Sequence, residues 1–181
     1  MHIGQLAASD APRYRELMLH AYAAAADAFT STPEERAAEP DSWWIKRIAD
    51  PDGLSVALGA FHDGALVGTV TIEFSAKPKI RHKAHLIGMF VRESCRGLGA
   101  GAQLVDAALQ VARARQGVAV VNLTVTEGNE AAIKLYEACG FRSFGVEPKA
   151  IATTAGYRSK MHMWLDLTQS PAGPEHALRN R

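Results

Sequence analysis

Apolar and polar positions in the first fifty residues predict one short strand followed by two helices. A capping residue before a proline marks the start of each helix, first at Asp10 and then at Thr32. Glu35, three residues after Thr32, completes the pattern of a capping box. The expected elements are a strand over residues 2–6, a helix from Ala11 to about Phe29, and a helix from Pro33 that is broken or restarted near Pro40 and ends before residue 50.

The next stretch has the pattern of three antiparallel strands. Apolar runs at residues 54–61 and 66–74 flank an Asp63-Gly64 pair, which is a good hairpin signal. A basic connection at Lys77–Lys83 leads to a third apolar run at residues 85–91. We therefore expect a hairpin followed by a third strand.

After Val91 the apolar positions change to the period of a helix. Leu104, Ala108 and Val111 share one face of a helix predicted from about Gly101 to Gln116. The remaining expected elements are a strand at residues 118–125, a helix capped by Asn129 that ends at Cys139, and strands at residues 141–146 and 161–167. Helices interleaved with short strands predict an α/β (α+β) fold in which helices cover a mixed sheet.

Composition limits the possible functions. The chain has 181 residues, of which 48% are hydrophobic and 22% charged, and its formal net charge is +1. These values predict one domain over residues 1–168 with a flexible C-terminal tail at 169–181. A charge near zero argues against nucleic acid or an anionic membrane as the main partner. No apolar run approaches the length of a bilayer span, and the N-terminus lacks the features of a signal peptide, so we expect a cytoplasmic protein.

The two cysteines, Cys95 and Cys139, suggest neither a disulfide framework nor a zinc site, because no close Cys or His pairs accompany them. We expect both to be small, mostly buried side chains in a reduced compartment, and we expect no metal.

The most informative segment is the glycine-rich stretch between the third apolar run and the following helix. Glycines allow the backbone to approach a ligand closely, and the first turn of a helix offers free amides, so the segment is suited to a phosphate or pyrophosphate. Arg92 and Arg96 can add charge. The spacing of Gly97, Gly99 and Gly101 is not that of a dinucleotide-binding loop, and no Gly-Lys-Ser/Thr sequence of a nucleotide-triphosphate loop follows. A glycine-rich turn without a ligand is the structural alternative.

Two motifs resemble the GNAT superfamily of acyl-CoA-dependent N-acyltransferases. Arg96-Gly97-Leu98-Gly99-Ala100-Gly101 matches its Gln/Arg-x-x-Gly-x-Gly/Ala signature. The segment from Asn129 to Phe141 resembles its second motif, Asn-x-x-Ala-x-x-x-Tyr-x-x-x-Gly-Phe, at the expected distance. The resemblance implies a mixed, mostly antiparallel seven-stranded sheet, flanked by about four helices, with a splayed central strand pair. At the family level it also implies a homodimer.

The resemblance further implies acetyl-CoA as co-substrate and assigns residues to it. Backbone groups of the strand at residues 86–91 would pair with the pantetheine amides, and the glycine loop would hold the pyrophosphate. Tyr136 would point toward the thioester sulfur and protonate the leaving thiolate. The expected acetyl-CoA-binding residues are Met89, Val91, Arg96, Gly97, Leu98, Gly99, Ala100, Gly101, Ala102, Asn129 and Tyr136.

The reaction also needs a base, because only a neutral amine attacks a thioester. Neutralising a lysine-like amine at pH 7 costs about 4.6 kcal/mol. Glu73 is the first candidate, because it shares one face of its strand with Thr69 and Thr71, which can place it in the substrate cleft. His85, Glu147 and water remain open as alternatives. Relatives that acetylate protein N-termini often carry Leu-Glu-Val in the fifth strand, where this chain has Leu123-Thr124-Val125.

We therefore expect an N-acetyltransferase that moves an acetyl group to a primary amine by direct attack, with a small-molecule acceptor. Trp43, Trp44, Tyr22, Phe29 and Tyr157 are candidate pocket aromatics, although burial in the core is the commoner explanation for each. The alternatives are a protein or peptide N-acetyltransferase and a non-catalytic acyl-CoA sensor. Only the Lys77–Lys83 segment supports a nucleic-acid binder.

Overall fold

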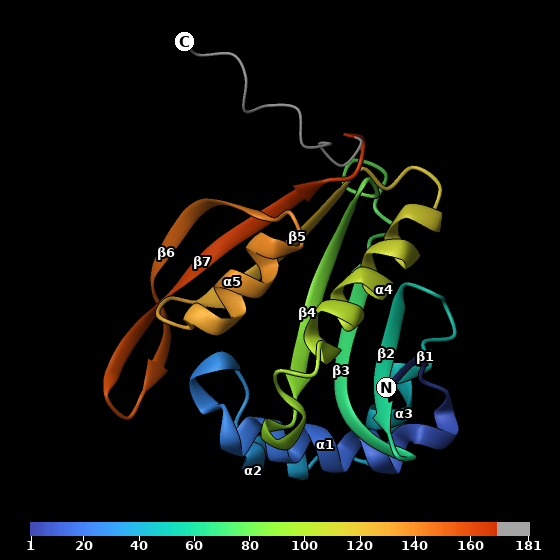
Figure 1. Ribbon diagram of the computed structural model, residues 1–181, viewed down its shortest axis with the longest axis vertical. Coiled ribbons are helices and arrows are strands. Elements are labelled where there is room, and N and C mark those ends of the chain that lie inside the picture. Colours follow the sequence, from blue (N-terminus) through green and yellow to red (C-terminus); the bar gives the residue numbers. More distant parts are fainter. Residues whose placement is uncertain (170–181) are drawn as a thin grey trace.

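The computed structural model describes residues 1–169, so the predicted tail lies, apart from Gln169, outside the described residues. Its centre is a seven-stranded sheet in the order β1-β2-β3-β4-β5-β7-β6 (Figure 1). The β4–β5 pair is parallel, and the other neighbours are antiparallel. The strands are β1 (His2–Gln5), β2 (Ser55–His62), β3 (Ala65–Phe74), β4 (Lys83–Val91), β5 (Val120–Thr126), β6 (Arg142–Thr153) and β7 (Gly156–Asp166).

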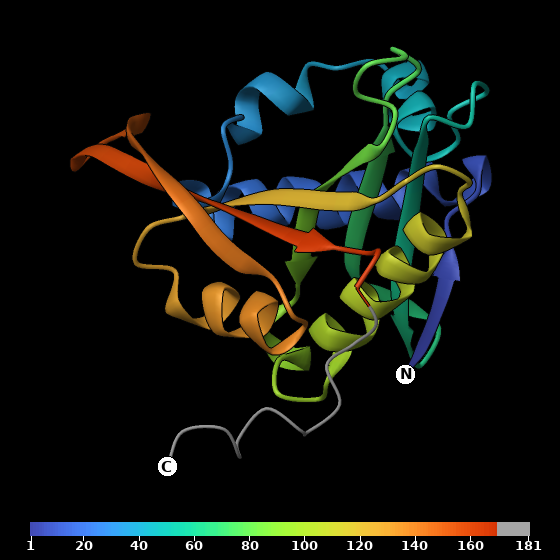
Figure 2. The same ribbon diagram turned by 90° about the horizontal axis from the view of Figure 1, so that it is seen from above.

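Helices cover both faces of this sheet. They are α1 (Ala11–Ala24), α2 (Pro33–Ala37), α3 (Asp41–Ile48), α4 (Ala100–Ala114) and α5 (Glu130–Ala138). Figure 2 shows α4 and α5 on one face and α1, α2 and α3 on the other. The mixed α/β fold is confirmed. The described residues contain five such helices rather than about four, because the break at Pro40 separates α2 from α3.

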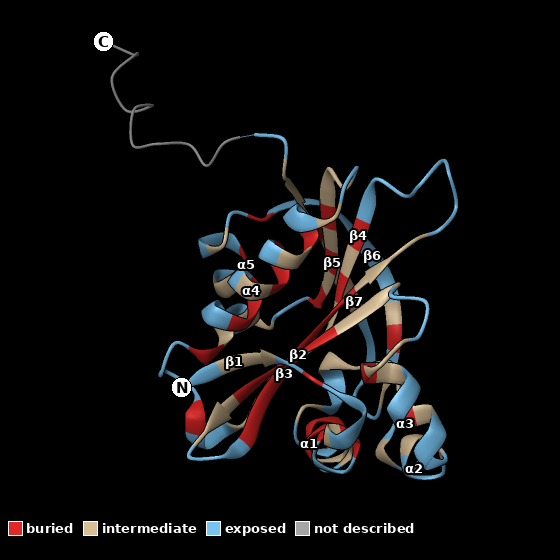
Figure 3. Cartoon of the chain, turned by 90° about the vertical axis from the view of Figure 1, so that its right-hand side faces the viewer, coloured by how far each residue is buried: buried red, intermediate tan, exposed pale blue. Residues whose placement is uncertain are grey.

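Each face has its own apolar core, as the buried segments in Figure 3 indicate. On one side, Leu104 and Val105 of α4 pack with Val70 and Ile72 of β3. On the other, Tyr14, Leu17 and Met18 of α1 pack with Trp44 and Ile48 of α3. Trp44 therefore belongs to the core. None of the helices within residues 1–169 has the length and apolarity needed to cross a bilayer.

The first helix is shorter than predicted. It ends at Ala24, and a single 3-10 turn at Ala26–Ala28 follows. The alanines after Tyr22 offer no large side chain to hold another helical turn on the sheet. Phe29 instead adopts extended backbone and packs edge-on against Tyr22, with ring centroids 5.0 Å apart.

The last two strands are longer than predicted. The expected segments, 141–146 and 161–167, are the paired ends of a hairpin that continues to Thr153 and Gly156. Residues 147–149 and several that follow are exposed or half-buried, so no apolar alternation marks them. Pairing between β6 and β7, interrupted by two register shifts, forms this extension.

The parallel strands β4 and β5 separate soon after they meet. Only Lys83, Ala84 and His85 pair with β5, at Val120–Asn122. Further along, β4 stays paired with β3 through a one-residue bulge at Gly88, whose φ is +62°. Figure 1 shows the two strands meeting near the top of the view and diverging below. The predicted splayed pair is thus confirmed.

Candidate active site

The splay between β4 and β5 opens into a cavity of about 330 Å³. Leu86–Met89 of β4 and Thr124–Thr126 of β5 form two of its walls, and α5 contributes Tyr136. Tyr22 and Phe29, two of the candidate aromatics, line it as well. The cavity therefore joins the open strand edge to the first and last helices.

One wall of this cavity is an unpaired strand edge. Beyond His85 the backbone of β4 has no β5 partner, so an extended ligand with amide groups can pair with it as an added strand would. Of the two residues predicted to do so, Met89 lines the cavity. Val91 lies two residues beyond Met89, outside the cavity lining, and its carbonyl accepts a 3.2 Å hydrogen bond from Arg96 Nε.

The glycine loop lies at the end of this edge. Gly97 and Gly99 have φ of +77° and +79°, a backbone conformation that residues other than glycine rarely adopt. Gly99 caps α4 without a side-chain hydrogen bond, and residues 96–99 are exposed. The first-turn amides of Ala100, Gly101 and Ala102 are thus not capped by a side chain of the N-cap residue, as an anion cradle requires.

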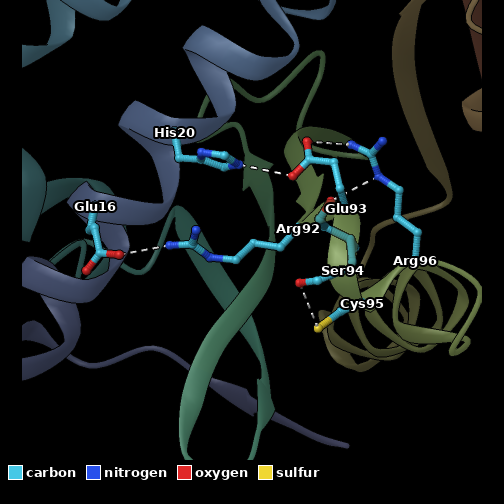
Figure 4. A network of polar contacts seen from close by, with 8 residues as sticks. Glu16, His20, Arg92, Glu93, Ser94, Cys95 and Arg96 are labelled. Atoms are coloured by element: carbon cyan, nitrogen blue, oxygen red, sulfur yellow. Dashed lines mark hydrogen bonds and ion pairs between the residues drawn. The ribbon is translucent and has the colours of Figure 1, made fainter.

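Polar contacts tie this loop to α1 (Figure 4). Arg92 donates a 2.9 Å hydrogen bond to Glu16 on α1, and His20 lies 3.0 Å from Glu93. Arg96 approaches the same Glu93 at 3.3 Å. The hydrogen bond from His20 lowers the pKa of Glu93, which favours the carboxylate that these partners share. Both arginines predicted near the phosphates thus have carboxylate partners.

Asn129 and Tyr136, the two residues of the second motif that were assigned to acetyl-CoA, both line the cavity. Asn129 caps α5 as predicted: its Oδ1 accepts a 3.3 Å hydrogen bond from the amide of Ala132. Tyr136 is buried, and its ring meets Phe141 edge-on at 5.9 Å. Burial raises the pKa of Tyr136, so the phenol keeps its proton at neutral pH and can only donate it.

The structure brings the candidate bases Glu73 and His85 side by side across β3 and β4, where they are partners in register. Glu73 lies 3.7 Å from the guanidinium of Arg47. It lines a neighbouring cavity of about 440 Å³ and does not belong to the splay cavity's lining. Burial lowers the pKa of His85, and the opposing Glu73 counteracts this, so His85 is neutral at pH 7.

Glu147, the third candidate, is less directly placed. It lies 3.3 Å from His162 on β7 and pairs in register with Lys160, which lines the splay cavity. Among the remaining aromatics, Trp43 lines the neighbouring cavity, and Tyr157 is 67% exposed on the β6–β7 hairpin.

Two cavity residues, Arg47 and Lys160, were not predicted from the sequence. Arg47 is one of several charges on the polar side of a short helix, and Lys160 lies on the strand extension without an apolar pattern. No local pattern distinguishes either from a solvated surface residue. Within residues 1–169, no three His, Cys, Asp or Glu side chains gather as a metal site would require.

Comparisons with known proteins agree with this geometry. The model of the acetyltransferase (GNAT) family matches residues 16–141. The L-amino acid N-acetyltransferase AaaT of Escherichia coli K12 is 29% identical over 123 residues, covering 68% of this chain and 75% of that protein. The L-methionine sulfoximine/L-methionine sulfone acetyltransferase of Pseudomonas aeruginosa PAO1 is 38% identical over 80 residues, covering 44% of this chain and 42% of its own length.

Solved structures share the fold. The structure of yncA from Salmonella typhimurium, a putative acetyltransferase with acetyl-CoA, superimposes with a TM-score of 0.77 at 21% identity and covers 97% of this chain and 98% of its own. The ribosomal-protein-alanine N-acetyltransferase of Brucella melitensis gives a TM-score of 0.76 at 23% identity, covering 92% and 100%. With its family match, its two motifs and its splayed sheet, the chain belongs to the GNAT family of acetyltransferases, enzymes that use acetyl-CoA.

Proposed function

We propose that this enzyme transfers the acetyl group of acetyl-CoA to the amine of a small, amino-acid-like molecule. The observation that carries the proposal is the splay cavity, which joins an unpaired strand edge to a small, partly apolar pocket beside Tyr136. The activities for which the two curated relatives are named, on L-amino acids and on L-methionine sulfoximine or sulfone, support this acceptor class.

Acetyl-CoA occupies the open face of the molecule in this proposal. Its pyrophosphate binds to the amides of residues 97–102, with Arg96 nearby, and its pantetheine arm pairs with the β4 edge at Met89 and Val91. Asn129 lies beside the arm. The dipole of α4 contributes only about 0.3–1 kcal/mol, so directed amide hydrogen bonds supply most of the binding.

The chemical step is direct attack. The amine nitrogen bonds to the thioester carbonyl carbon, the carbon–sulfur bond breaks, and the thiolate of CoA leaves. The nitrogen loses a proton, and the leaving sulfur gains one. Tyr136 supplies the proton or hydrogen bond at sulfur, because its buried phenol is protonated and lines the cavity.

Glu73 is the proposed base and acts through water, because it borders the neighbouring cavity rather than the splay cavity. His85 lies opposite it and is the second candidate, since its neutral ring has a free lone pair. Either group lowers the cost of deprotonating an ammonium that would otherwise stay charged at pH 7.

The first prediction concerns the acceptor. The purified protein will release CoA thiol from acetyl-CoA with free amino acids and not with polyamines, aminoglycosides or short peptides. Thiol release is measured against each class, with CoA binding measured by calorimetry on the same sample. Release with peptides alone would identify a protein or peptide acetyltransferase, and CoA binding without release from any amine would favour a sensor.

Gly99→Val will abolish CoA binding, because the side chain occupies the space that the pyrophosphate approaches. The matched control is Gly117→Val at the other end of α4, where φ is +83° against +79° at Gly99, so the backbone strain is similar. Calorimetry should show lost affinity in the first variant only. Equal losses would mean that strain, and not the loop, causes the effect.

Tyr136→Phe will lower turnover roughly 100-fold, the usual size of a general-acid contribution, and will leave the KM for acetyl-CoA almost unchanged. Phe keeps the ring against Phe141, so the fold is preserved. Steady-state kinetics at saturating acceptor measure this. A rate like that of the unmodified enzyme would remove Tyr136 from the acid role.

Glu73→Gln will lower kcat, by an amount of the same order, and His85→Gln will leave it near the original value. The two substitutions remove the two candidate bases while keeping their approximate size. If His85 is the base, activity decreases when the pH is lowered below the pKa of His85, which burial has itself lowered. This acidic limb of the pH–rate profile is then absent in His85→Gln. That result would transfer the role to His85.

A further inference from the structure

Arg47 is the one residue shared by the linings of the splay cavity and its neighbour, as far as residues 1–169 define them. It lies in the last turn of α3, on the face of the sheet covered by α1. It therefore stands between the pocket beside Tyr136 and the space that Glu73 borders.

The guanidinium of Arg47 has close neighbours, but its hydrogen-bond donors are not all satisfied. It lies 5.6 Å from the centre of the Trp43 ring, and it lowers the pKa of the buried Tyr14, which desolvation raises. Its ion pair with Glu73, at 3.7 Å, is longer than a hydrogen bond. Its buried Nε has no hydrogen-bond partner among the described residues. A planar donor fork in this state suits a carboxylate, which accepts two parallel hydrogen bonds.

The charges of the site favour a zwitterionic acceptor. Arg47 and Lys160 bring positive charge to the splay cavity, and Glu73 lies beside Arg47. His85, which is opposite Glu73 in register, is also within electrostatic range of His162 and Lys160. An α-amino acid carries an ammonium and a carboxylate on one carbon, so it can oppose both members of a close Glu–Arg pair.

We propose that Arg47 binds the α-carboxylate of the acceptor, which makes free α-amino acids the substrate class and Arg47 the residue that selects them. This inference rests on the proposed function and deepens it. The carboxylate lies on Arg47, the ammonium lies toward Glu73, and the amine formed by its deprotonation faces the thioester beside Tyr136.

Arg36 provides a matched control on the same aromatic ring. Its guanidinium lies 4.7 Å from the centre of Trp43, but its terminal nitrogens are engaged by Ser31 at 2.6 Å and by Glu39 at 3.5 Å. It is not part of the splay cavity's lining. Substituting Arg36 thus removes an arginine from Trp43 without removing the proposed carboxylate site.

The experiment compares L-leucine, L-methionine and L-serine with their amides as acceptors. The α-amines of the amides are less basic than those of the acids, so a larger fraction of the amides is neutral and reactive at pH 7. Without recognition of the carboxylate, the enzyme should therefore prefer the amides. We expect the acids to be preferred by the unmodified enzyme and by Arg36→Gln. In Arg47→Gln, kcat/KM for the acids will fall about 10- to 100-fold, mostly through KM, and the preference will disappear.

Arg47→Lys keeps the charge but not the fork, so its preference for acids will be weaker and still present. The KM for acetyl-CoA will be unchanged in all these variants. Amides that react as well as the acids, or an Arg47→Gln variant that keeps the preference, would overturn the role of Arg47 while leaving acetyl transfer intact.

A binding measurement separates this inference from the proposed function. N-acetyl-L-methionine and its amide are titrated into the enzyme with CoA by calorimetry, with the unmodified chain and Arg47→Gln. Binding of the acid alone, lost in Arg47→Gln, supports the carboxylate site even if no amine is acetylated, and only the transferase proposal then fails. Equal binding of the acid and the amide, or binding of neither, overturns the carboxylate site at Arg47.

Discussion

The separation of β4 from β5 after three paired residues is the constraint on which the rest of the site depends. A continuous sheet would satisfy the backbone groups of both strands and leave no room between them. The bulge at Gly88 keeps β4 hydrogen-bonded to β3 while its other edge stays open. That edge then offers unpaired amides and carbonyls, with which a ligand that has its own amides can pair. The cavity beside Tyr136 and the position of the glycine loop both follow from this opening.

A second consequence concerns how the loop is positioned. An anion cradle of glycines has few side chains with which to anchor itself, so its neighbours must fix it. The contacts of Arg92 with Glu16 and of His20 with Glu93 connect it to α1, which packs on the sheet through its own core (Figure 4). Arg92 thus serves the site through its attachment to a helix. Each exposed pair contributes little by itself, and their combined effect is to restrict the loop's orientation.

What could be predicted from the sequence is what local patterns determine. The hairpin around Asp63-Gly64, the capping of α5 by Asn129 and the glycine loop all depend on neighbours in the chain, and all were found as expected. The end of α1 and the length of the β6–β7 hairpin were predicted wrongly, because tertiary packing and strand pairing determine them. Arg47 could not be selected at all, since its ion pair with Glu73 forms only where α3 meets the end of β3.

The burial of Tyr136 bears directly on its proposed role. Desolvation raises the pKa of the phenol, and this alone would make it a poorer acid. In the proposed reaction the leaving thiolate forms beside the buried Tyr136, however, and desolvation raises the pKa of a thiol for the same reason. What governs transfer is the difference between the two, which is about 1.5 units in water and corresponds to roughly 2 kcal/mol. Burial therefore keeps the proton on Tyr136 until charge develops on sulfur, and a hydrogen bond donated at that moment stabilises the transition state more than the thioester.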